Sequence, residues 1–404
     1  MSWDTCKFSS LYAIPSRNGL TRPSGSRGKG YKMVNMGELF SNGRIGNIPM
    51  ELVELEDSKK EAYGVKEGDL LFARQSLVLE GAGKCSWIKE VSEYTTFESH
   101  LIRVRLNPDV AVSLFYYYYF NSPQSPIKSI VQQCAQAGIR ASDLEDLNVL
   151  CPPLPIQRRI ADILSAYDDL IENNQRQIKL LEEAAMRLYR EWFVFMRFPG
   201  HESVRIVDGV PEGWQEATIG EMAEYLNGFA FKPSDWKEEG YPIIKIKELT
   251  EGVTSDTPKN SGESIPEKYL VKKGDIIFSW SATLFVKIWD LEDGLLNQHL
   301  FKVTPLQNVC REFVLQSIQG ALPEFYNLTT GSTMVHIQRD KLDRVKRLIP
   351  DKEIMRQYEE TSVPIREKIL SLTSQISSLQ KARDALLPRL MNGGEGLKLE
   401  GGAV

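Results

Sequence analysis

Two stretches of this chain decide its fold: residues 167–192 (YDDLIENNQRQIKLLEEAAMRLYREW) and residues 365–390 (IREKILSLTSQISSLQKARDALLPRL). In each, mostly apolar residues recur at alternating intervals of four and three, which is the seven-residue repeat of a coiled coil. Every position of the first seam has its counterpart 198 residues later. Each helix can therefore be the other's partner, and we predict an antiparallel coiled coil within one chain. The seam residues are Tyr167, Ile171, Asn174, Ile178, Leu181, Ala185, Leu188 and Trp192 in the first stretch, and Ile365, Ile369, Leu372, Ile376, Leu379, Arg383, Leu386 and Leu390 in the second.

The rest of the chain also contains an internal sequence repeat. The repeated strings keep their order, and their offset drifts only from 211 to 198 residues. The pairs are Trp3 and Trp214, Asn18-Gly19 and Asn227-Gly228, Gly30-Tyr31 and Gly240-Tyr241, Gly68-Asp69-Leu70-Leu71-Phe72 and Gly274-Asp275-Ile276-Ile277-Phe278, and His100-Leu101 and His299-Leu300. The chain thus contains two copies of one unit, each a globular part followed by a long helix.

Each globular part mixes strand-like runs with helical ones. Leu70-Leu71-Phe72-Ala73 predicts a buried strand, and residues 101–106 have the composition of another. We predict an α+β chain with mostly antiparallel pairing, in which two similar α/β globular domains are joined by two long helices that form an antiparallel intramolecular coiled coil. The predicted boundaries are 1–152 for the first domain, 153–200 for the first helical spacer, 201–350 for the second domain, 351–393 for the second spacer, and 394–404 for a disordered tail.

A proline marks where we expect a long helix to begin. Pro364 precedes Ile365, and proline is tolerated at a helix start but disruptive inside a helix. We predict a break there, and by analogy near Ser165, which with Asp168 resembles a capping box. The pair Asp168-Asp169 is expected to face solvent. Short helices at 156–164 and 353–362 would precede long ones at 166–196 and 364–391.

Composition indicates a globular protein without a membrane segment. Hydrophobic residues make up 42% of the 404 residues, enough for two to four packed domains. No apolar run reaches membrane-spanning length, and the N-terminus lacks the regions of a signal peptide. The five cysteines are odd in number and never in CxxC spacing. We therefore expect free thiols in a reducing cytoplasm and no structural zinc.

Charge is distributed unevenly. The net charge is -5, yet residues 1–32 hold six Lys and Arg against one acid. A basic stretch of this kind can contact DNA phosphates, or it can be a mobile basic loop without a partner. The candidate phosphate contacts are Arg17, Arg22, Arg27, Lys29 and Lys32.

The chain lacks the motifs of a self-contained nucleic-acid enzyme. It has no Walker A loop, no Asn/Asp-Pro-Pro-aromatic motif of an amino-methyltransferase, and no strand-linked GxGxxG. His100 and His299 are repeat equivalents, but each begins an apolar strand, where a packed, hydrogen-bonded histidine is the commoner case. We therefore expect no catalytic residue, metal ligand or cofactor in this chain, which would not be an enzyme by itself.

One segment points to a family. Residues 153–164, Pro-Leu-Pro-Ile-Gln-Arg-Arg-Ile-Ala-Asp-Ile-Leu, resemble the Pro-Leu-Pro-x-x-Glu-Gln-x-x-Ile segment of Type I restriction–modification specificity subunits. The Gly-Asp-Ile-Ile-Phe pattern and the two-copy layout are similar to that family as well, so the resemblance covers essentially the whole chain. Ile156 departs from the family's usual acid, and the second copy is degraded at residues 354–357.

The resemblance implies a non-catalytic, DNA-binding subunit of the bacterial or archaeal cytoplasm. Each globular domain would be a target-recognition domain that reads one half of a bipartite, asymmetric site in double-stranded DNA. The helices would set the spacing and dock two modification subunits, which bring S-adenosylmethionine for adenine-N6 methylation. Two restriction subunits would add cleavage dependent on ATP and Mg2+. The alternatives are a coiled-coil adaptor without a DNA role and a self-contained DNA methyltransferase or nuclease.

Base readout is expected from polar side chains on loops beside the recurring strands. Arginine suits guanine and glutamine suits adenine, each through two hydrogen bonds. Packing roles for Trp280 and His336 are equally compatible with the sequence. The candidates are Arg74 and Gln75 in the first copy, and Trp280, Ser281, Thr283, Thr333, His336, Gln338 and Arg339 in the second.

Overall fold

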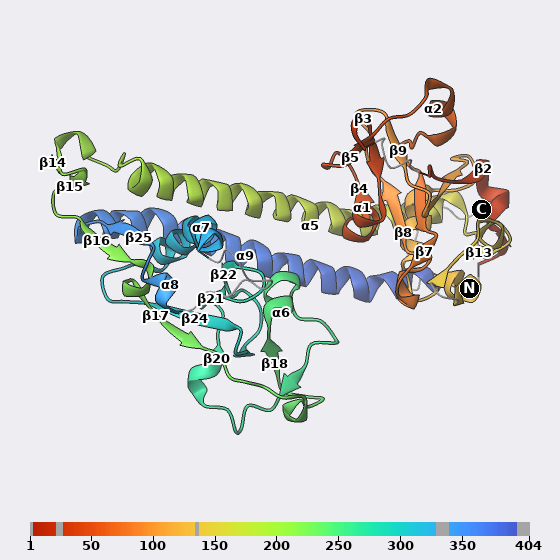
Figure 1. Cartoon of the computed structure of the whole chain (residues 1–404). Coiled ribbons are helices and arrows are strands. Elements are labelled where there is room, and N and C mark those ends of the chain that lie inside the picture. The colour runs from red at the N-terminus through yellow and green to blue at the C-terminus, as the bar shows by residue number, and fades with distance from the viewer. Residues whose placement is uncertain (1–2, 22–26, 134–136, 329–338, 394–404) are drawn as a thin grey trace, which may run out of the picture. The chain divides into compact units, whose positions relative to one another are not determined.

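The computed structural model describes residues 3–21, 27–133, 137–328 and 339–393 (Figure 1). The chain forms two compact units, one made of residues up to Leu170 and from Leu379 onward, the other of Ile171–Ser378. The two long helices, α5 (Leu154–Tyr189) and α9 (Lys352–Met391), each contribute to both units. The tail predicted at 394–404 lies outside the described residues.

The first unit is built on a five-stranded sheet in the order β2-β10-β6-β8-β4, with smaller sheets β5-β3-β9, β11-β12-β7 and β1-β13. Its strands are β1 (Thr5–Lys7), β2 (Tyr12–Asn18), β3 (Arg27–Val34), β4 (Arg44–Ile45), β5 (Glu51–Val53), β6 (Leu70–Ala73), β7 (Gln75–Ser76), β8 (Cys85–Ile88), β9 (Thr95–Phe97), β10 (Leu101–Leu106), β11 (Gln132–Gln133), β12 (Ala137–Gly138) and β13 (Asn148–Leu150). Its short helices are α1 (Met36–Ser41), α2 (Asp57–Tyr63), α3 (Ser113–Phe120) and α4 (Ala141–Glu145).

The second unit is built on two four-stranded sheets, β17-β24-β21-β22 and β19-β18-β23-β20, with the pairs β16-β25 and β14-β15. Its strands are β14 (Ile206–Val207), β15 (Val210–Pro211), β16 (Gln215–Thr218), β17 (Ala223–Asn227), β18 (Tyr241–Ile244), β19 (Lys259–Asn260), β20 (Leu270–Val271), β21 (Ile276–Ser279), β22 (Phe285–Ile288), β23 (Gly294–Leu296), β24 (Leu300–Pro305) and β25 (Lys346–Ile349). Its helices are α6 (Ile246–Glu251), α7 (Arg311–Asn327) and α8 (Arg339–Leu342).

The two units share one core topology. The order β2-β10-β6-β8 corresponds to β17-β24-β21-β22, and β1-β13 corresponds to β16-β25. The register agrees too, since Ile102 pairs with Phe72 as Phe301 pairs with Phe278. One parallel pairing is shared as well, because β3 pairs with β9 as β18 pairs with β23, whereas the parallel pair β4-β8 has no counterpart among the described strands of the second unit. The predicted α+β class and internal repeat are therefore confirmed.

The recurring Gly-Asp strand lies at the centre of each sheet. Successive residues of β6 are buried in two different hydrophobic cores, one on each face of the sheet. Gly68 enters the strand with φ +86°, a conformation that favours glycine. The carboxylate of Asp69 is fully buried and accepts two hydrogen bonds of 2.7 Å from the guanidinium of Arg105. A buried ion pair thus fixes the turn before the strand.

Both long helices run without the predicted breaks. α9 continues through Pro364, and α5 continues through Ser165, whose hydroxyl donates to the carbonyl of Asp162 at 3.3 Å instead of capping a helix. A proline inside a helix costs about 3 kcal/mol. Pro364 is exposed, however, and apolar residues buried before and after it, such as Tyr358 and Ile369, hold the helix together. The predicted breaks are wrong because tertiary burial outweighs that local cost.

In the first unit, α5 and α9 are joined at Asp168. Its carboxylate accepts hydrogen bonds of 2.6 Å from Tyr118 of α3 and from Arg383 of α9. Asp168 is 6% exposed, so the prediction that it faces solvent is wrong. The neighbouring Asp169 is more exposed and forms an ion pair with Arg44.

In the second unit, the side-chain amide of Asn174 donates to Gln375 of α9 at 3.3 Å. Moving from Asp168 to Asn174 along α5, the partner on α9 changes from Arg383 to Gln375. The two helices therefore pack in opposite directions, and the predicted antiparallel pairing is confirmed. Each residue of the predicted seam is buried or half-buried.

A buried ion pair attaches α9 to the rest of the second unit. The Nε of Arg366 lies 3.1 Å from a carboxylate oxygen of Glu312 on α7, and both side chains are less than a tenth exposed. Arg311 also lies 3.5 Å from the Glu312 carboxylate, but it is partly exposed. Burial of these two charges is tolerable only because they are paired.

The ends of the long helices belong to the hydrophobic cores. Leu390 and Met391 at the end of α9 pack in the core of the first unit. Trp192 and Phe193, in the short π-helix Arg190–Val194 that follows α5, pack in the core of the second. Neither core is complete without both helices.

Two cysteines are bonded to each other. Cys6 and Cys151 form a disulfide with their Cα atoms 6.2 Å apart, because the pairing of β1 with β13 brings them to the same place. The prediction of free thiols is wrong for this pair. Cys85 and Cys310 are buried free thiols, and burial raises the pKa of Cys310 to about 12. Cys134 lies outside the described residues.

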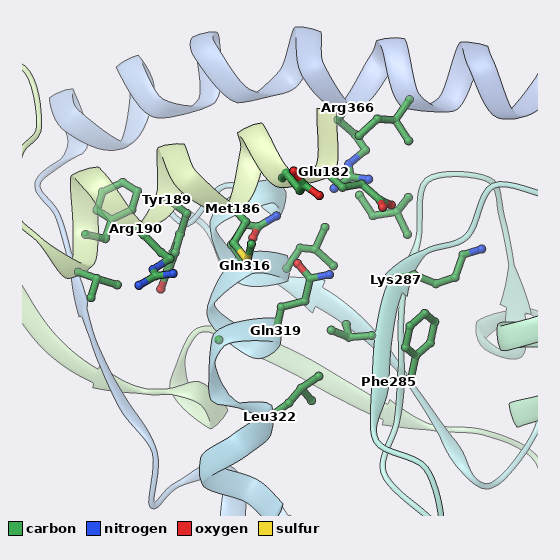
Figure 2. A pocket seen from close by; sticks show the side chains of 18 of the residues that line it. Glu182, Met186, Tyr189, Arg190, Phe285, Lys287, Gln316, Gln319, Leu322 and Arg366 are labelled. Atoms are coloured by element: carbon green, nitrogen blue, oxygen red, sulfur yellow. The ribbon is translucent and has the colours of Figure 1, made fainter. Parts of the chain in front are cut away.

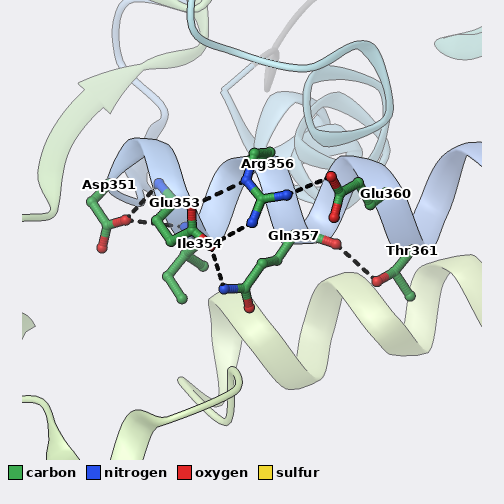
Figure 3. Close-up of polar contacts among 7 residues, drawn as sticks. All are labelled: Asp351, Glu353, Ile354, Arg356, Gln357, Glu360 and Thr361. Carbon is green, nitrogen blue, oxygen red and sulfur yellow. Dashed lines mark hydrogen bonds and ion pairs between the residues drawn. The ribbon is translucent and has the colours of Figure 1, made fainter.

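The start of α9 carries an exposed ionic cluster (Figure 3). Asp351 accepts from the backbone N–H groups of Glu353 and Ile354. The guanidinium of Arg356 bridges the carboxylates of Glu353 and Glu360. Hydrogen bonds from Arg356 lower the pKa of Glu353 to about 2. More than half of each of these three charged side chains is exposed, so the cluster contributes little to stability.

The buried and exposed ion pairs should respond differently to mutation. Arg366→Met removes the α9 cation from buried Glu312 and should destabilise the protein by roughly 3 kcal/mol. The double variant Arg366→Met, Glu312→Leu should recover most of that loss, as measured by urea unfolding followed through tryptophan fluorescence. Arg356→Met, in the exposed cluster, is the matched control and should leave the midpoint unchanged. A double variant as unstable as the single one would contradict this account.

Candidate nucleic-acid interface

Those predicted phosphate contacts of the first unit whose backbone is described lie on strands rather than in a loop. Arg17 is exposed near the end of β2, with its guanidinium 5.2 Å from the ring centre of Tyr63. Lys29 is exposed on β3 between Gly28 and Gly30, whose φ angles are +90° and +97°. The pairing of β3 shifts register here, as at a β-bulge, which redirects side chains.

The other basic candidates are less available or not described. Lys32 is half-buried and lies 2.7 Å from the carboxylate of Glu93, which already compensates its charge. Arg22 and the side chain of Arg27 lie outside the described residues. Among the described candidates, Arg17 and Lys29 therefore present their charge best.

The predicted base readers of the first unit, Arg74 and Gln75, follow β6 at the edge of the small sheet β11-β12-β7. Gln75 pairs with Gly138 of β12. Arg74 is half-buried, and its backbone N–H donates to the carbonyl of His100 at 2.7 Å. The side chain of His100 is 51% exposed, so the prediction of a packed histidine is wrong. The fold thus brings Arg74 and His100 together through their backbones, with Gln75 next to Arg74 in the chain.

The second unit places repeat-equivalent residues in the same way. Trp280 is half-buried, with its ring centre 6.0 Å from that of His299. His299 is exposed, so the packed-histidine prediction is wrong here too. Thr283 is exposed, whereas Ser281 is buried. The hydroxyl of Ser279 donates to the carbonyls of both residues and fixes the turn.

The remaining candidates of the second unit are mostly not described. Arg339 is exposed at the start of α8. Thr333, His336 and Gln338 lie outside the described residues.

Sequence reasoning missed two surface features. Leu77, Val78 and Leu79 form an exposed apolar run next to Arg74 and Gln75; an apolar triplet between two strands was the signal for it. In the second unit, the ammonium of Lys245 lies 4.5 Å from the ring centre of the exposed Trp236. The repeat alignment could have located that pair, since it lies close to Gly240-Tyr241, the equivalent of Gly30-Tyr31.

A cavity of about 1110 Å³ lies in the second unit between α5, α7, β22 and α9 (Figure 2). Its wall mixes apolar side chains such as Met186 and Leu322 with charged ones such as Glu182 and Arg366. Burial raises the pKa of the Glu182 carboxyl. Met186 and Val194 remain about half exposed at this wall. It is a surface that another protein could cover.

The described residues contain no cluster of three or more His, Cys, Asp or Glu that could hold a metal ion. No helix in the described part of the chain is long and apolar enough to cross a membrane.

A family model described as the Type I restriction modification DNA specificity domain matches residues 3–183 and 211–375. The chain belongs to this family. It is a DNA specificity subunit of a Type I restriction–modification system and is not itself catalytic. The two matched segments correspond to the two copies of the repeat.

Specificity subunits of other organisms are similar in sequence, and one solved structure is similar in fold. The MjaIX specificity subunit of Methanocaldococcus jannaschii is 25% identical over 304 residues, which cover 70% of this chain and 69% of that one. The HindI specificity subunit of Haemophilus influenzae is 22% identical over 436 residues, covering 89% and 93%. The Type-I restriction-modification S subunit from M. genitalium has a similar fold, with a TM-score of 0.56 and 15% identity over 96% of both chains.

The exposed cations Arg17 and Lys29 should contribute to DNA affinity without contributing to specificity. Charge reversal of both should weaken binding to specific and random DNA alike, and should reduce the slope of log K against log salt by about 0.9 per lost phosphate contact. Fluorescence anisotropy at several salt concentrations measures this slope. Arg158→Glu with Arg159→Glu, also exposed, is the matched control. An unchanged slope in the Arg17, Lys29 variant would refute the assignment.

Proposed function

We propose that each unit carries one target-recognition domain, at residues 1–152 and 201–350, and that each domain reads one half of a bipartite, asymmetric site in double-stranded DNA. The observation that carries this proposal is the duplication. The two units share strand order and register, but their surface loops differ. A common framework with different loops suits two readers of different sequences.

The reading surfaces would be the loops after the Gly-Asp strands. Arg74 and Gln75 would read bases in the first half-site; Trp280, Thr283 and Arg339 would contribute in the second. Thr333, His336 and Gln338 remain candidates for the second half-site as well. The buried Ser281 would act by shaping the turn.

The spacers at 153–200 and 351–393 would set the distance between the half-sites. Two readers on one face of B-DNA sit about one helical turn apart, roughly 34–36 Å. A continuous α5 and α9, without the breaks expected from sequence, support a stiff spacer.

The same helices would dock two modification subunits. The cavity beside α5, with Met186 and Val194 half exposed, is the surface we assign to one of them. Those subunits would supply S-adenosylmethionine and methylate adenine N6. Two restriction subunits would add ATP- and Mg2+-dependent cleavage, and the complex would work in the cytoplasm.

A coiled-coil adaptor without a DNA role is the second candidate, since the cavity suits a protein partner. It leaves the exposed Arg17 and Lys29 and the placement of Arg74 beside His100 unexplained. A mobility shift on a random DNA library, with and without the modification subunit, separates the two. No retention of DNA in either case would favour the adaptor.

A genome-wide map of adenine methylation tests the reading of half-sites. A host carrying this chain and its modification subunit should show N6-methyladenine in a motif of two defined parts separated by unspecified bases. Arg74→Ala or Gln75→Ala should relax only the first part, and Trp280→Ala or Arg339→Ala only the second. Each lost two-point contact removes about 1–3 kcal/mol of discrimination. A variant that alters the part of the motif assigned to the other unit would contradict the assignment of that residue to its half-site.

An insertion tests whether the length of the helices sets the distance between the two half-sites. Four residues between Gln177 and Ile178 add about one helical turn, roughly 6 Å, so the seam still faces its partner. The methylated motif should keep both parts and gain a longer gap. The same insertion in the turn between β14 and β15, at Asp208-Gly209, is the control and should leave the gap unchanged. If the α5 variant methylates only the original spacing, the helices do not set it.

A further inference from the structure

The loop after β7 presents an apolar tip to solvent. Leu77, Val78 and Leu79 are 88%, 58% and 46% exposed, and Leu77 is the most exposed large hydrophobic residue in the described part of the chain. Three consecutive exposed apolar side chains are unfavourable in water and point to a partner that covers them.

Hydrogen bonds and close packing hold the base of the loop that carries the tip. At its base, the N–H of Gly83 donates to the carbonyl of Ala73 at 2.8 Å, and the N–H of Ala73 donates to Lys84 at 2.9 Å. The hydroxyl of Ser76 accepts from the N–H of Val78 at 3.2 Å. A Cβ added at the buried Gly81 would lie 2.2 Å from the Ser76 hydroxyl. The apolar tip is therefore held out from a closely packed base.

Polar and cationic groups surround the base of the tip. Arg74 and Gln75 precede it, separated from Leu77 only by Ser76. Arg140 is exposed and follows Ile139, whose N–H donates to the Arg74 carbonyl at 2.9 Å. Arginine and glutamine are side chains that read base edges. Glu80, the exposed residue that follows the tip, suits a base edge as well, since a carboxylate accepts from the amino group of cytosine.

The second unit has no counterpart of the tip within its described residues. Residues 74–84 separate the two central strands of the first unit, whereas residues 280–284 suffice in the second. At the equivalent place, Trp280 packs beside His299. The apolar tip is thus an addition to the first unit's connection that the equivalent connection of the second unit lacks.

We infer that Leu77, Val78 and Leu79 form an apolar wedge that inserts at a base step of the first half-site in duplex DNA, unstacks that step and bends the duplex. The inference rests on the proposed function and deepens it. Leucine-sized wedges from DNA-binding proteins unstack base steps in this way, and the bend lets more of the protein touch the DNA. The second half-site is read without such a wedge.

Duplex DNA fits the tip better than a protein surface does. The tip, Arg74 and Gln75 all belong to the connection between β6 and β8, so any DNA read by those two side chains passes within a few residues of Leu77. A protein that covered the tip would also cover these two readers.

The test uses the full chain with its modification subunit and a duplex carrying the methylated motif, with 2-aminopurine placed at each position of the first half-site in turn. The wild type should raise the fluorescence at one step other than the methylated adenine, whose extrusion by the modification subunit raises the signal in wild type and variant alike. Leu77→Ser with Val78→Ser should abolish that rise and weaken binding about tenfold, the loss expected for two exposed apolar contacts. The salt slope should stay unchanged, because no phosphate contact is lost.

Ile206→Ser with Val207→Ser, an exposed apolar pair on β14, is the matched control and should behave as wild type. Thermal melting confirms that both variants fold. Wild-type affinity and fluorescence in the Leu77, Val78 variant would overturn the wedge. So would a loss confined to assembly with the modification subunit, which would make the tip a protein contact. If the wild type itself does not prefer the motif over a scrambled duplex, the proposed function fails instead.

Discussion

The burial of helix ends in hydrophobic cores is the constraint on which the rest of this structure depends. Each core takes residues from both long helices, with Leu390 and Met391 entering the first and Trp192 and Phe193 the second. These two pairs are repeat equivalents, 198 positions apart. Because neither globular part completes its core with its own helix alone, the helical pair and the domains must fold together. The continuity of α9 through Pro364 follows from the same burial.

Polar contacts add specificity to that packing. Asp168 and Arg366 occupy repeat-equivalent positions, and each reaches the helix that follows the central sheet, through Tyr118 in one unit and Glu312 in the other. The residue at this repeat position is an acid, Asp168, in the first copy and a base, Arg366, in the second. Its partner is accordingly a hydroxyl donor in the first unit and a carboxylate in the second. A buried charge tolerates few arrangements, so these contacts fix how each long helix meets its own domain without requiring the two units to be identical.

The repeat and the seam could be predicted from the sequence because both are patterns of spacing. The buried strand at residues 70–73 could also be predicted, because it is a short apolar run that follows the Gly-Asp string, but the order of the strands in the sheet could not. The failures share a different cause. The predicted break at Pro364 and the predicted exposure of Asp168 rest on local sequence, and the free thiol at Cys6 rests on the number and spacing of cysteines, whereas contacts distant in the chain decide all three. The prediction that His100 and His299 are packed is wrong for a related reason, because a position at the start of a strand does not determine whether the side chain is buried. For the candidate site, residue type identified Arg74 and Gln75, but only the fold places Arg74 beside His100.

The two units differ in the loops that we propose to contact bases, which is where two domains that read different DNA sequences must differ. Their shared sheets fix the ends of the loops after the central strand, and the loops themselves vary in length and chemistry, from residues 74–84 in one copy to residues 280–284 in the other. A change confined to such a loop leaves the buried Asp69 turn and the helix ends untouched. Stability and specificity are therefore carried by separate residues, and a duplicated framework can acquire two unlike reading surfaces. An asymmetric target is the expected consequence of that separation, because the two surfaces are free to diverge while the cores remain alike.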